Sequence, residues 1–232
     1  MTGRTGGADG GADVLPGSRS ALDPGRAIKP GRHGLSPEAV AGIQRERLID
    51  AFVEVVSERG CPQTTISGVA GAAGVTKKTF YEHFDGLDAC FLAAYRRGMD
   101  ILHRRMWDAY EAAPSWPDGV HAALRTMLAL LTREPRFARA ALIEANAAGP
   151  DVRLARLDDL ARFRAFFTAP GLPRVPDAVA DAVVGGVVSA VRVRIETDDS
   201  PDLRSLLPSL TYFAVLPLLG REAAAPYLAG ER

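Results

Sequence analysis

The sequence predicts an all-α protein in which a small three-helix head precedes a larger helical body. Apolar residues recur at intervals of three and four along most of the chain, as amphipathic helices require. Proline or glycine stands at each predicted boundary, and no segment alternates apolar and polar residues between turn signals. We therefore expect three regions: a disordered tail over residues 1–36, the head over residues 37–84, and the body over residues 85–232.

The composition is sufficient for a folded core and limits the kind of charged surface that the protein can have. The chain has 232 residues, 47% of them apolar, which suffices for one large domain or two modest ones. Its 28 basic and 28 acidic residues cancel. A protein coated with positive charge for nucleic acid is thereby excluded, so any nucleic-acid surface must be a local basic patch.

The cysteines and the termini give further limits. Cys61 and Cys90 lack the spacing of metal ligands, and we expect both to be buried free thiols, with no metal and no cofactor. The N-terminus has no charged-then-apolar signal pattern, and no apolar run approaches the ~18 residues of a membrane span. A cytoplasmic protein without membrane contact is expected.

The tail is rich in glycine and has no aromatic residue, so it cannot bury enough apolar area to offset the entropy of ordering. We expect a solvated leader. Its end is weakly basic, and contact with a phosphate backbone is the alternative; the basic residues are Arg26, Lys29, Arg32 and His33.

The head begins with clear helix signals. Ser36-Pro37 is an N-cap followed by proline at the first helical position, and the helical period then continues to Gly60. Thr64-Thr65 caps a second, short helix. Gly74-Val75 is a tight turn, after which Thr76 caps a third helix that runs through Phe84.

The body should be helical to its end. A long helix is expected from Leu87 to about Glu111. Further helices are expected near 118–133, 135–147, 151–168, 177–196 and 202–219. The valine-rich run Val183–Val188 could form a strand, but its continuation as far as Ile195 favours a buried helix.

Two short helices joined by a glycine-containing turn form a helix-turn-helix, whose second helix can enter the major groove of DNA. Phe80 and Phe84 are four apart and must share the inward face, while Val75 and Phe80 have the spacing of a hydrophobic staple. The residues left on the exposed arc and its flanks are Lys77, Lys78, Thr79, Tyr81 and His83.

The lysine pair is unusual in this chain, whose other basic residues are almost all arginine. Lysines at a helix N-terminus are repelled by the helix dipole unless a phosphate or a base acceptor meets them. Glu82 lies four residues after Lys78 and can pair with it. We expect contact with double-stranded DNA. A merely solvated face is the alternative, and RNA is disfavoured because no aromatic sheet is present.

The stretch Arg45–Phe91, "RERLIDAFVEVVSERGCPQTTISGVAGAAGVTKKTFYEHFDGLDACF", resembles the DNA-binding head of the tetracycline-repressor (TetR) family of bacterial regulators. The shared features are the helix ending in Glu-Arg-Gly, the Thr-Thr cap, the Ala-x-x-x-Gly-Val turn and the Thr-Phe-Tyr-x-His-Phe run. The similarity covers about a fifth of the chain. The remainder matches as an all-helical body of suitable length.

The resemblance implies roles for individual residues. Lys77 and Lys78 would face base edges, and Thr65 would cap its helix against a phosphate. The remaining three exposed residues of the third helix would hold the backbone or flank the bases; these are Thr79, Tyr81 and His83.

Two positions depart from the family pattern. Ser67 stands where members often have arginine, and Leu87, flanked by Asp85 and Asp88, stands where they often have a lysine that contacts phosphate. Ser67 remains a candidate contact of shorter reach. Fewer phosphate contacts predict weaker and less salt-dependent binding.

One short helix contacts only a few base pairs, so specificity needs a second copy one DNA turn away, ~34 Å. We therefore expect a homodimer. Gly185-Gly186 would allow another helix to approach, and the last helix has apolar surface on more than one side, with Pro208 and Pro217 expected to kink or shorten it. The expected interface residues are Gly185, Gly186, Tyr212, Phe213 and Leu216. The resemblance implies a four-helix interface, and core helices within one monomer are the alternative.

A regulator also needs a site that binds a signal molecule. The body contains apolar residues with a few polar groups among them, the composition that is typical of small-molecule pockets. The candidate lining residues are His103, Met106, Trp107, Tyr110, His121, Met127, Phe137, Glu144, Asn146, Phe163 and Phe167. The resemblance implies that a small-molecule effector moves the long helix and changes the separation of the two heads. We expect a repressor that the ligand releases from a palindromic operator.

Two other functions fit the sequence less well. An all-α enzyme is disfavoured because the sequence contains no phosphate loop, nucleophile elbow, HExxH or metal-ligand cluster. The pairs Asp158-Asp159 and Asp198-Asp199 are poor acid/base dyads. A DNA-organising protein or constitutive regulator without ligand control remains the nearer alternative, which sequence-blind binding would support.

Overall fold

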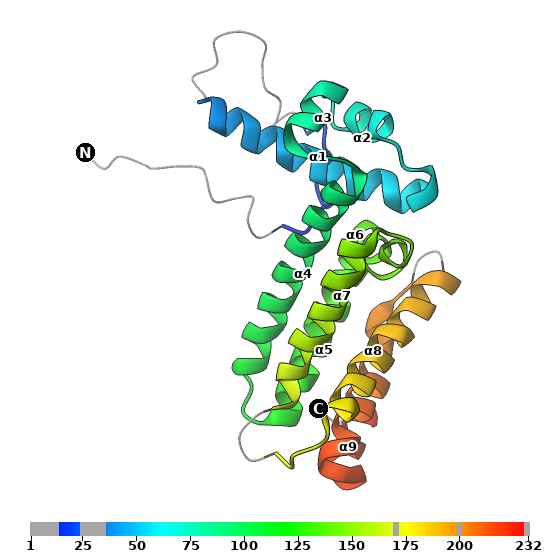
Figure 1. Cartoon of the computed structure of the whole chain (residues 1–232). Helices are drawn as coiled ribbons and strands as arrows, with labels where there is room; N and C mark the ends of the chain where they lie inside the picture. Colours follow the sequence, from blue (N-terminus) through cyan, green and yellow to red (C-terminus); the bar gives the residue numbers. More distant parts are fainter. Residues whose placement is uncertain (1–13, 24–35, 169–171, 199–200, 230–232) are drawn as a thin grey trace, which may run out of the picture.

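The computed structural model describes residues 14–23, 36–168, 172–198 and 201–229, and within them the fold is all-α, as predicted. Figure 1 shows the head at one end of an elongated helical body, with α4 running from the head down one side of the body and α9 reaching furthest from the head. The α-helices are α1 Pro37–Arg59, α2 Ile66–Ala72, α3 Lys77–His83, α4 Leu87–Glu111, α5 Trp116–Arg133, α6 Pro135–Leu142, α7 Pro150–Phe163, α8 Asp177–Thr197 and α9 Leu207–Leu228. The 3₁₀ turns are η2 Cys61–Gln63, η3 Glu144–Asn146, η4 Arg164–Phe167 and η5 Leu203–Leu206.

Helix α1 begins and ends at its capping residues, and both α2 and α3 pack against it. The Ser36 side chain accepts a hydrogen bond from the Ala39 N–H (3.2 Å), and Pro37 occupies the first turn, where its missing N–H costs nothing. The helix ends at Gly60, whose φ of 79° favours glycine and whose N–H bonds the Val56 carbonyl. Its second half is buried between the head and the body.

Helix α4 joins the head to the body. Its first turns close the head core, where Phe91 packs against Phe52 of α1 with ring centroids 5.0 Å apart. Its later turns pack along α5 and α7, burying Met99, Leu102 and Met106. The valine-rich segment 183–188 lies within α8 and is helical, as expected from its length.

Both cysteines are free thiols, as expected. Cys90 is buried, and burial raises the pKa of its thiol. Cys61 is half-buried rather than buried, and burial together with Glu144 and Asp88 raises its pKa. Neither thiol is therefore activated for chemistry.

The tail differs from the expectation of disorder over residues 1–36. Residues 14–23, which we call the N-terminal strap, fold into turns against α1, and Leu15 and Ala21 are 4% and 1% exposed. The basic residues Arg26, Lys29, Arg32 and His33 lie outside the described residues. Composition pointed to a solvated tail because the strap has few apolar residues, yet α1 supplies the apolar surface that they cover.

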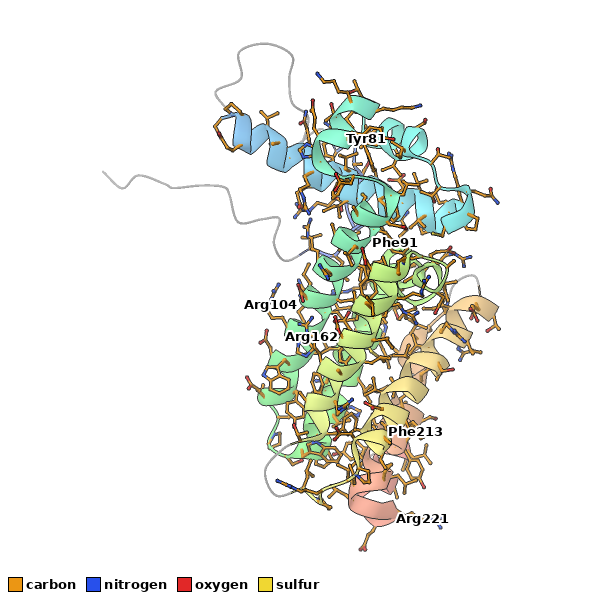
Figure 2. All side chains as sticks on the ribbon, in the orientation of Figure 1. Tyr81, Phe91, Arg104, Arg162, Phe213 and Arg221 are labelled. Atoms are coloured by element: carbon orange, nitrogen blue, oxygen red, sulfur yellow. The ribbon has the colours of Figure 1, made fainter. Side chains whose placement is uncertain are left out.

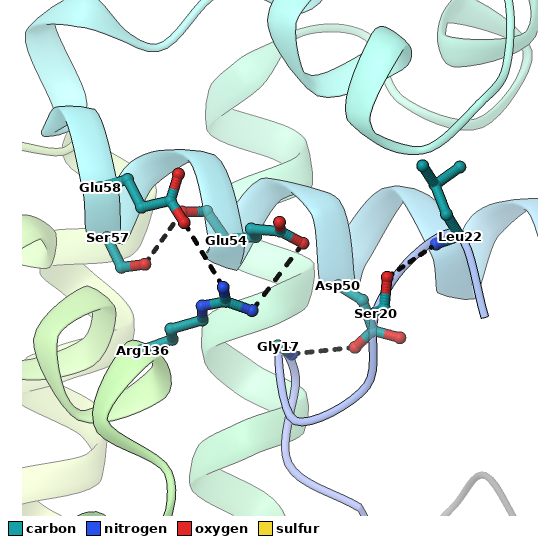
Figure 3. Close-up of polar contacts among 8 residues, drawn as sticks. All are labelled: Gly17, Ser20, Leu22, Asp50, Glu54, Ser57, Glu58 and Arg136. Atoms are coloured by element: carbon teal, nitrogen blue, oxygen red, sulfur yellow. Dashed lines mark hydrogen bonds and ion pairs between the residues drawn. The ribbon is translucent and has the colours of Figure 1, made fainter.

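Polar contacts fix the strap on α1 (Figure 3). The Gly17 N–H donates to Oδ1 of Asp50 (2.9 Å), a carboxylate that is only 5% exposed. Nε of Arg47 donates to the Ala21 carbonyl (2.8 Å), and Arg97 of α4 donates to the Val14 carbonyl (3.4 Å). The strap thus contacts the head and the top of the body together.

The C-terminal helix is longer than the expected 202–219. Pro208 falls in the first turn of α9, where proline is tolerated, and so does not kink it. The kink instead lies at Gly220 (φ 78°), three residues after Pro217. The helix resumes because Tyr227 is buried, with its hydroxyl donating to Oδ1 of Asp118 (2.6 Å) and its ring beside His121.

Helix α9 is unusually apolar for its position. With η5 it forms the segment Leu203–Leu228, the one described stretch that is long and apolar enough to cross a membrane by length and composition. Only 33% of its most apolar 18-residue window is buried within the chain. The segment is kinked at Gly220 and tied to α5 through Tyr227, and part of its apolar surface is exposed.

The strap should contribute to stability through Leu15. Leu15→Ala should lower the free energy of unfolding by about 2–3 kcal/mol because it removes a buried side chain, as core Leu→Ala changes do. Leu22→Ala is the matched control, because Leu22 belongs to the same strap but is 59% exposed, and a change within about 0.5 kcal/mol is expected. Urea unfolding of the two variants measures both, and equal effects would contradict the packing.

Candidate nucleic-acid interface

The turn between α2 and α3 is fixed by a glycine in the left-handed region. Gly74 has φ 63°, its N–H bonds the Gly71 carbonyl (3.0 Å), and the Val75 N–H bonds the Ala70 carbonyl (2.9 Å). This pair of bonds is a Schellman motif, which satisfies the last carbonyls of α2 and turns the chain sharply. The orientation of α3 against α2 follows from this turn.

Helix α3 is anchored from one side, as predicted. Oγ1 of Thr76 accepts from the Thr79 N–H (3.1 Å) and caps the helix. Phe80 is fully buried, and the Phe80 and Phe84 rings lie 5.8 Å apart in the core of the head. Val75 is half-buried against the same core. The opposite face of this seven-residue helix is therefore turned to solvent.

The exposed face of α3 carries the predicted lysine pair, Lys77 and Lys78, which form a basic edge. Lys77 and Lys78 are exposed at the first turn, and Tyr81 is 57% exposed one turn further on. Figure 2 shows Tyr81 at the end of the molecule farthest from Arg221, on the outer side of the head. Nζ of Lys78 lies 3.9 Å from Oε1 of Glu82, as predicted, and this surface pair is weak enough to yield to a phosphate.

Two of the predicted DNA-contact residues, Thr79 and His83, are half-buried and contact other residues of the head. Thr79 is half-buried, and its hydroxyl lies 3.0 Å from that of Thr76. His83 is half-buried with Nε2 3.5 Å from Oε1 of Gln44 on α1. Burial lowers the pKa of His83, so its ring is neutral at pH 7 and adds no positive charge to the edge. These two side chains hold α3 more than they extend from it.

The start of α2 has a basic neighbour that the sequence analysis missed. Thr65 caps α2 by accepting from the Gly68 N–H (3.1 Å), as predicted, and Ser67 is exposed on the same turn. Arg59, the exposed last residue of α1, directs its guanidinium toward this turn, with Nη1 3.6 Å from where a Cβ on Gly68 would lie. The Glu-Arg-Gly signal that ends α1 could have indicated it.

The structure brings only some predicted pocket residues together. Met106, Met127, Phe163 and Phe167 line one apolar cavity in the body. The aromatic group beside it contains His103, Trp107, Tyr110, Phe163 and Phe166. Burial lowers the pKa of His103, and its buried Nε2 has no hydrogen-bond partner among the described residues.

The other predicted pocket residues have structural contacts. Nδ1 of His121 lies 3.2 Å from the Thr211 hydroxyl, and Phe137 is buried where α6 crosses Gly98. Asn146 donates to backbone carbonyls at the end of α6, and Glu144 accepts from the Cys61 N–H (2.9 Å). These contacts hold helices in place.

Of the expected dimer residues, the two glycines of α8 face other helices of the same chain, whereas those of α9 are partly exposed. Gly186 faces Phe213 of α9 so closely that a Cβ would lie 2.8 Å from the ring, and this contact is within the chain. Gly185 lines a cavity toward α7. On α9, Phe213 is 41% exposed, and Tyr212 and Leu216 are half-buried beside it.

This geometry defines a helix-turn-helix DNA-binding head on a helical body. The model of the bacterial regulatory proteins of the tetR family matches residues 48–94, which span the second half of α1, all of α2 and α3, and the first turns of α4. The match covers about a fifth of the chain and relates this head to that family.

A curated relative matches a segment of similar length. The uncharacterised HTH-type transcriptional regulator TtgW of Pseudomonas putida is 45% identical over 48 residues, which are 21% of this chain and 36% of the relative. The chain thus matches only about a third of that relative's length.

Solved structures share the fold over about three quarters of the chain. The fatty acid degradation regulator FadR from Bacillus halodurans superposes with a TM-score of 0.67 at 17% identity, covering 77% of this chain and 97% of that one. FadR from Bacillus subtilis, solved in complex with stearoyl-CoA, gives 0.64 at 20% identity, covering 72% and 96%. At these identities the likeness establishes the fold alone.

Two glycines of α2 and its turn give a matched test of the interface geometry. Gly74→Ala should destabilise the protein by about 1–2 kcal/mol, because alanine is strained at φ 63° and its Cβ would lie 2.7 Å from Arg47. Gly71→Ala should instead stabilise by about 0.5–1 kcal/mol, because it lies within α2 with open space around its Cβ. Thermal unfolding compares them, and the same sign for both would contradict the turn.

Proposed function

We propose that the protein is a dimeric transcription regulator whose two α3 helices bind successive major grooves of one DNA site. The single observation that supports this most strongly is the exposed Lys77-Lys78 edge on a helix whose other face is anchored by Phe80. Lysines at this end of a helix gain most when an acceptor on DNA meets them. Thr65, Ser67, Arg59 and Tyr81 would flank the groove, while Thr79 and His83 hold α3.

A homodimer through α8 and α9 is the second part of the proposal. The exposed apolar residues on these helices are Val193, Phe213, Leu219 and Leu228. Two thirds of the most apolar stretch of α9 is not buried within the chain, which a second copy would cover. Pairing through this side would leave both heads free at the other end of the body (Figure 1).

Control by a small molecule is the third part. The body contains an apolar cavity bounded by α4, the helix that enters the head. A ligand there would favour one position of α4 and so one separation of the two heads, which is how a ligand-released repressor would leave a palindromic operator. The stearoyl-CoA complex of the Bacillus subtilis relative supports ligand control in this fold. A cytoplasmic location follows from binding to bacterial DNA.

The alternative of a DNA-organising protein without ligand control is favoured only if the cavity is incidental. An enzyme is disfavoured because the matching family and the relatives named above are regulators.

The lysine edge can be tested on the DNA upstream of the protein's own gene. Lys77→Ala and Lys78→Ala should each weaken binding by about tenfold, because each removes a base or phosphate contact worth about 1–3 kcal/mol. A lysine on phosphate should also reduce the slope of log affinity against log salt by about one. Gel-shift titrations at several salt concentrations measure both quantities.

Arg221→Ala is the matched control, because Arg221 is an exposed cation at the opposite end of the molecule (Figure 2). It should leave affinity and salt dependence unchanged. If both lysine variants bind as tightly and selectively as the wild type, α3 is not the helix that contacts DNA.

The proposed interface can be tested separately from DNA. Phe213→Asp should convert the dimer to a monomer, because burying an unpaired carboxylate costs several kcal/mol. Leu154→Asp is the control, since Leu154 is 59% exposed on α7, away from the proposed interface. Sedimentation velocity gives the mass, and circular dichroism verifies folding. A dimeric Phe213→Asp protein would place the interface elsewhere.

A further inference from the structure

Two cavities of different chemistry meet inside the body. The first is about 60 Å³ and is lined only by apolar side chains from α4, α5, η4, α8 and α9 and the end of α7. The second is about 230 Å³ and lies between α4, α6, α7 and α8. Phe163 and Val188 line both, so the purely apolar cavity adjoins one that also contains charged side chains.

The second cavity has an excess of positive charge. Arg156 and Arg192 line it together with the Ser189 hydroxyl, and Asp159 is the one carboxylate among the described lining residues. Two guanidinium groups against one carboxylate leave one positive charge. Asp159 is moreover already paired, with Oδ1 3.1 Å from Nη1 of Arg162 and with the Tyr95 hydroxyl beside it.

One arginine of this cavity, Arg192, has an unsatisfied N–H although its side chain is 40% exposed overall. Nε of Arg192 is buried and has no hydrogen-bond partner in the described part of the chain, and its nearest carboxylate oxygen, Oε1 of Glu196, is 4.0 Å away. No carboxylate of the described residues pairs with Arg156. A buried guanidinium N–H without an acceptor is costly, so the site favours a ligand that supplies one.

We propose that the two cavities form one site for a small amphipathic carboxylate, with its apolar body beside Met106 and Phe163 and its carboxylate between Arg156 and Arg192. A guanidinium group matches the planar geometry of a carboxylate and binds it with two parallel hydrogen bonds. The single excess charge is neutralised by one such group. This assignment rests on the proposed ligand control and names the chemical class of the ligand.

Helix α6 connects this site to the head. Ala141 and Leu142 of α6 line the second cavity. On the same helix, Nη2 of Arg136 lies 3.4 Å from Oε1 of Glu58 on α1, as Figure 3 shows, and Nε of Arg139 lies 3.6 Å from Oε1 of Glu144. A carboxylate that shifts α6 would therefore act directly on α1.

Calorimetry on the full chain without DNA tests the ligand class. The probes are straight-chain carboxylates from butanoate to decanoate, each beside the alcohol and the ammonium compound of the same length. One or more carboxylates should bind at least about tenfold more tightly than the matched alcohol, because charge-assisted hydrogen bonds are worth about 1.5–3 kcal/mol. The ammonium compounds should not bind.

Matched variants locate the site. Arg192→Gln should weaken carboxylate binding by about tenfold, whereas Arg194→Gln should not, because Arg194 lies on the same helix but hydrogen-bonds Ser205 outside the cavity. Gly185→Leu should block the cavity without harming the fold, because nothing lies within 4 Å of the position of its Cβ. Gly42→Leu, at an equally open position on α1, is its control.

Equal binding of carboxylate and alcohol, undiminished binding by Arg192→Gln, or no carboxylate binding at millimolar concentration would each overturn the proposal. So would tighter binding of octanoyl-coenzyme A that does not depend on Arg192. Failure of this ligand assignment can be told apart from failure of the proposed ligand-controlled regulation. If carboxylates bind but do not release DNA, the site is correct and the proposed ligand control is wrong. If an unrelated ligand releases DNA and carboxylates do not bind, ligand control is correct and the assigned ligand class is wrong.

Discussion

The buried carboxylate of Glu144 sets how the head sits on the body. It is 7% exposed, accepts a hydrogen bond from the Cys61 N–H (2.9 Å), and lies 3.6 Å from Nε of Arg139. A buried carboxylate is tolerable only with such partners, because an unpaired one would lose its hydration without compensation. The end of α1, the start of η2 and the end of α6 must therefore meet at this one point.

The placement of the DNA-binding edge follows from this junction. Gly60 ends α1 beside Glu144, and from there the chain runs through η2 to the Thr65 cap and α2. The Schellman turn at Gly74 then orients α3 with Phe80 inward and the lysine pair outward. Because α6 ends at the same junction and lines the second cavity, the proposed ligand site and the head share this helix. Such an arrangement allows a local change in the cavity to move the head as a unit.

The sequence alone was sufficient where signals are local. The caps at Ser36, Thr65 and Thr76, the inward Phe80 and Phe84, and the exposed lysines depend on spacings within one turn of helix, and the structure has each of them. Contacts between distant residues were out of reach. The strap is ordered by apolar surface that α1 provides, and the last helix extends past Gly220 because Tyr227 meets Asp118.

The candidate cavities show the same limit. Phe163 and Met106 were expected to line a pocket on composition, but the arginines of the second cavity were not, because their position there depends on how α7 and α8 pack. Similarly, Gly185 was assigned to a dimer contact, although in the structure it leaves space toward α7. Helical periodicity gives the face of a residue, and only the tertiary arrangement shows what that face meets.

Amide hydrogen exchange in wild type and Glu144→Ala tests the central junction most directly. Removal of the carboxylate leaves the Cys61 N–H without its acceptor, so exchange within the first minute should rise in peptides covering residues 60–66 and 135–147. Peptides from the middle of α5, which does not reach the junction, should be unchanged. Unaltered exchange at residues 60–66, or an equal rise throughout α5, would contradict the claim that Glu144 holds the head on the body.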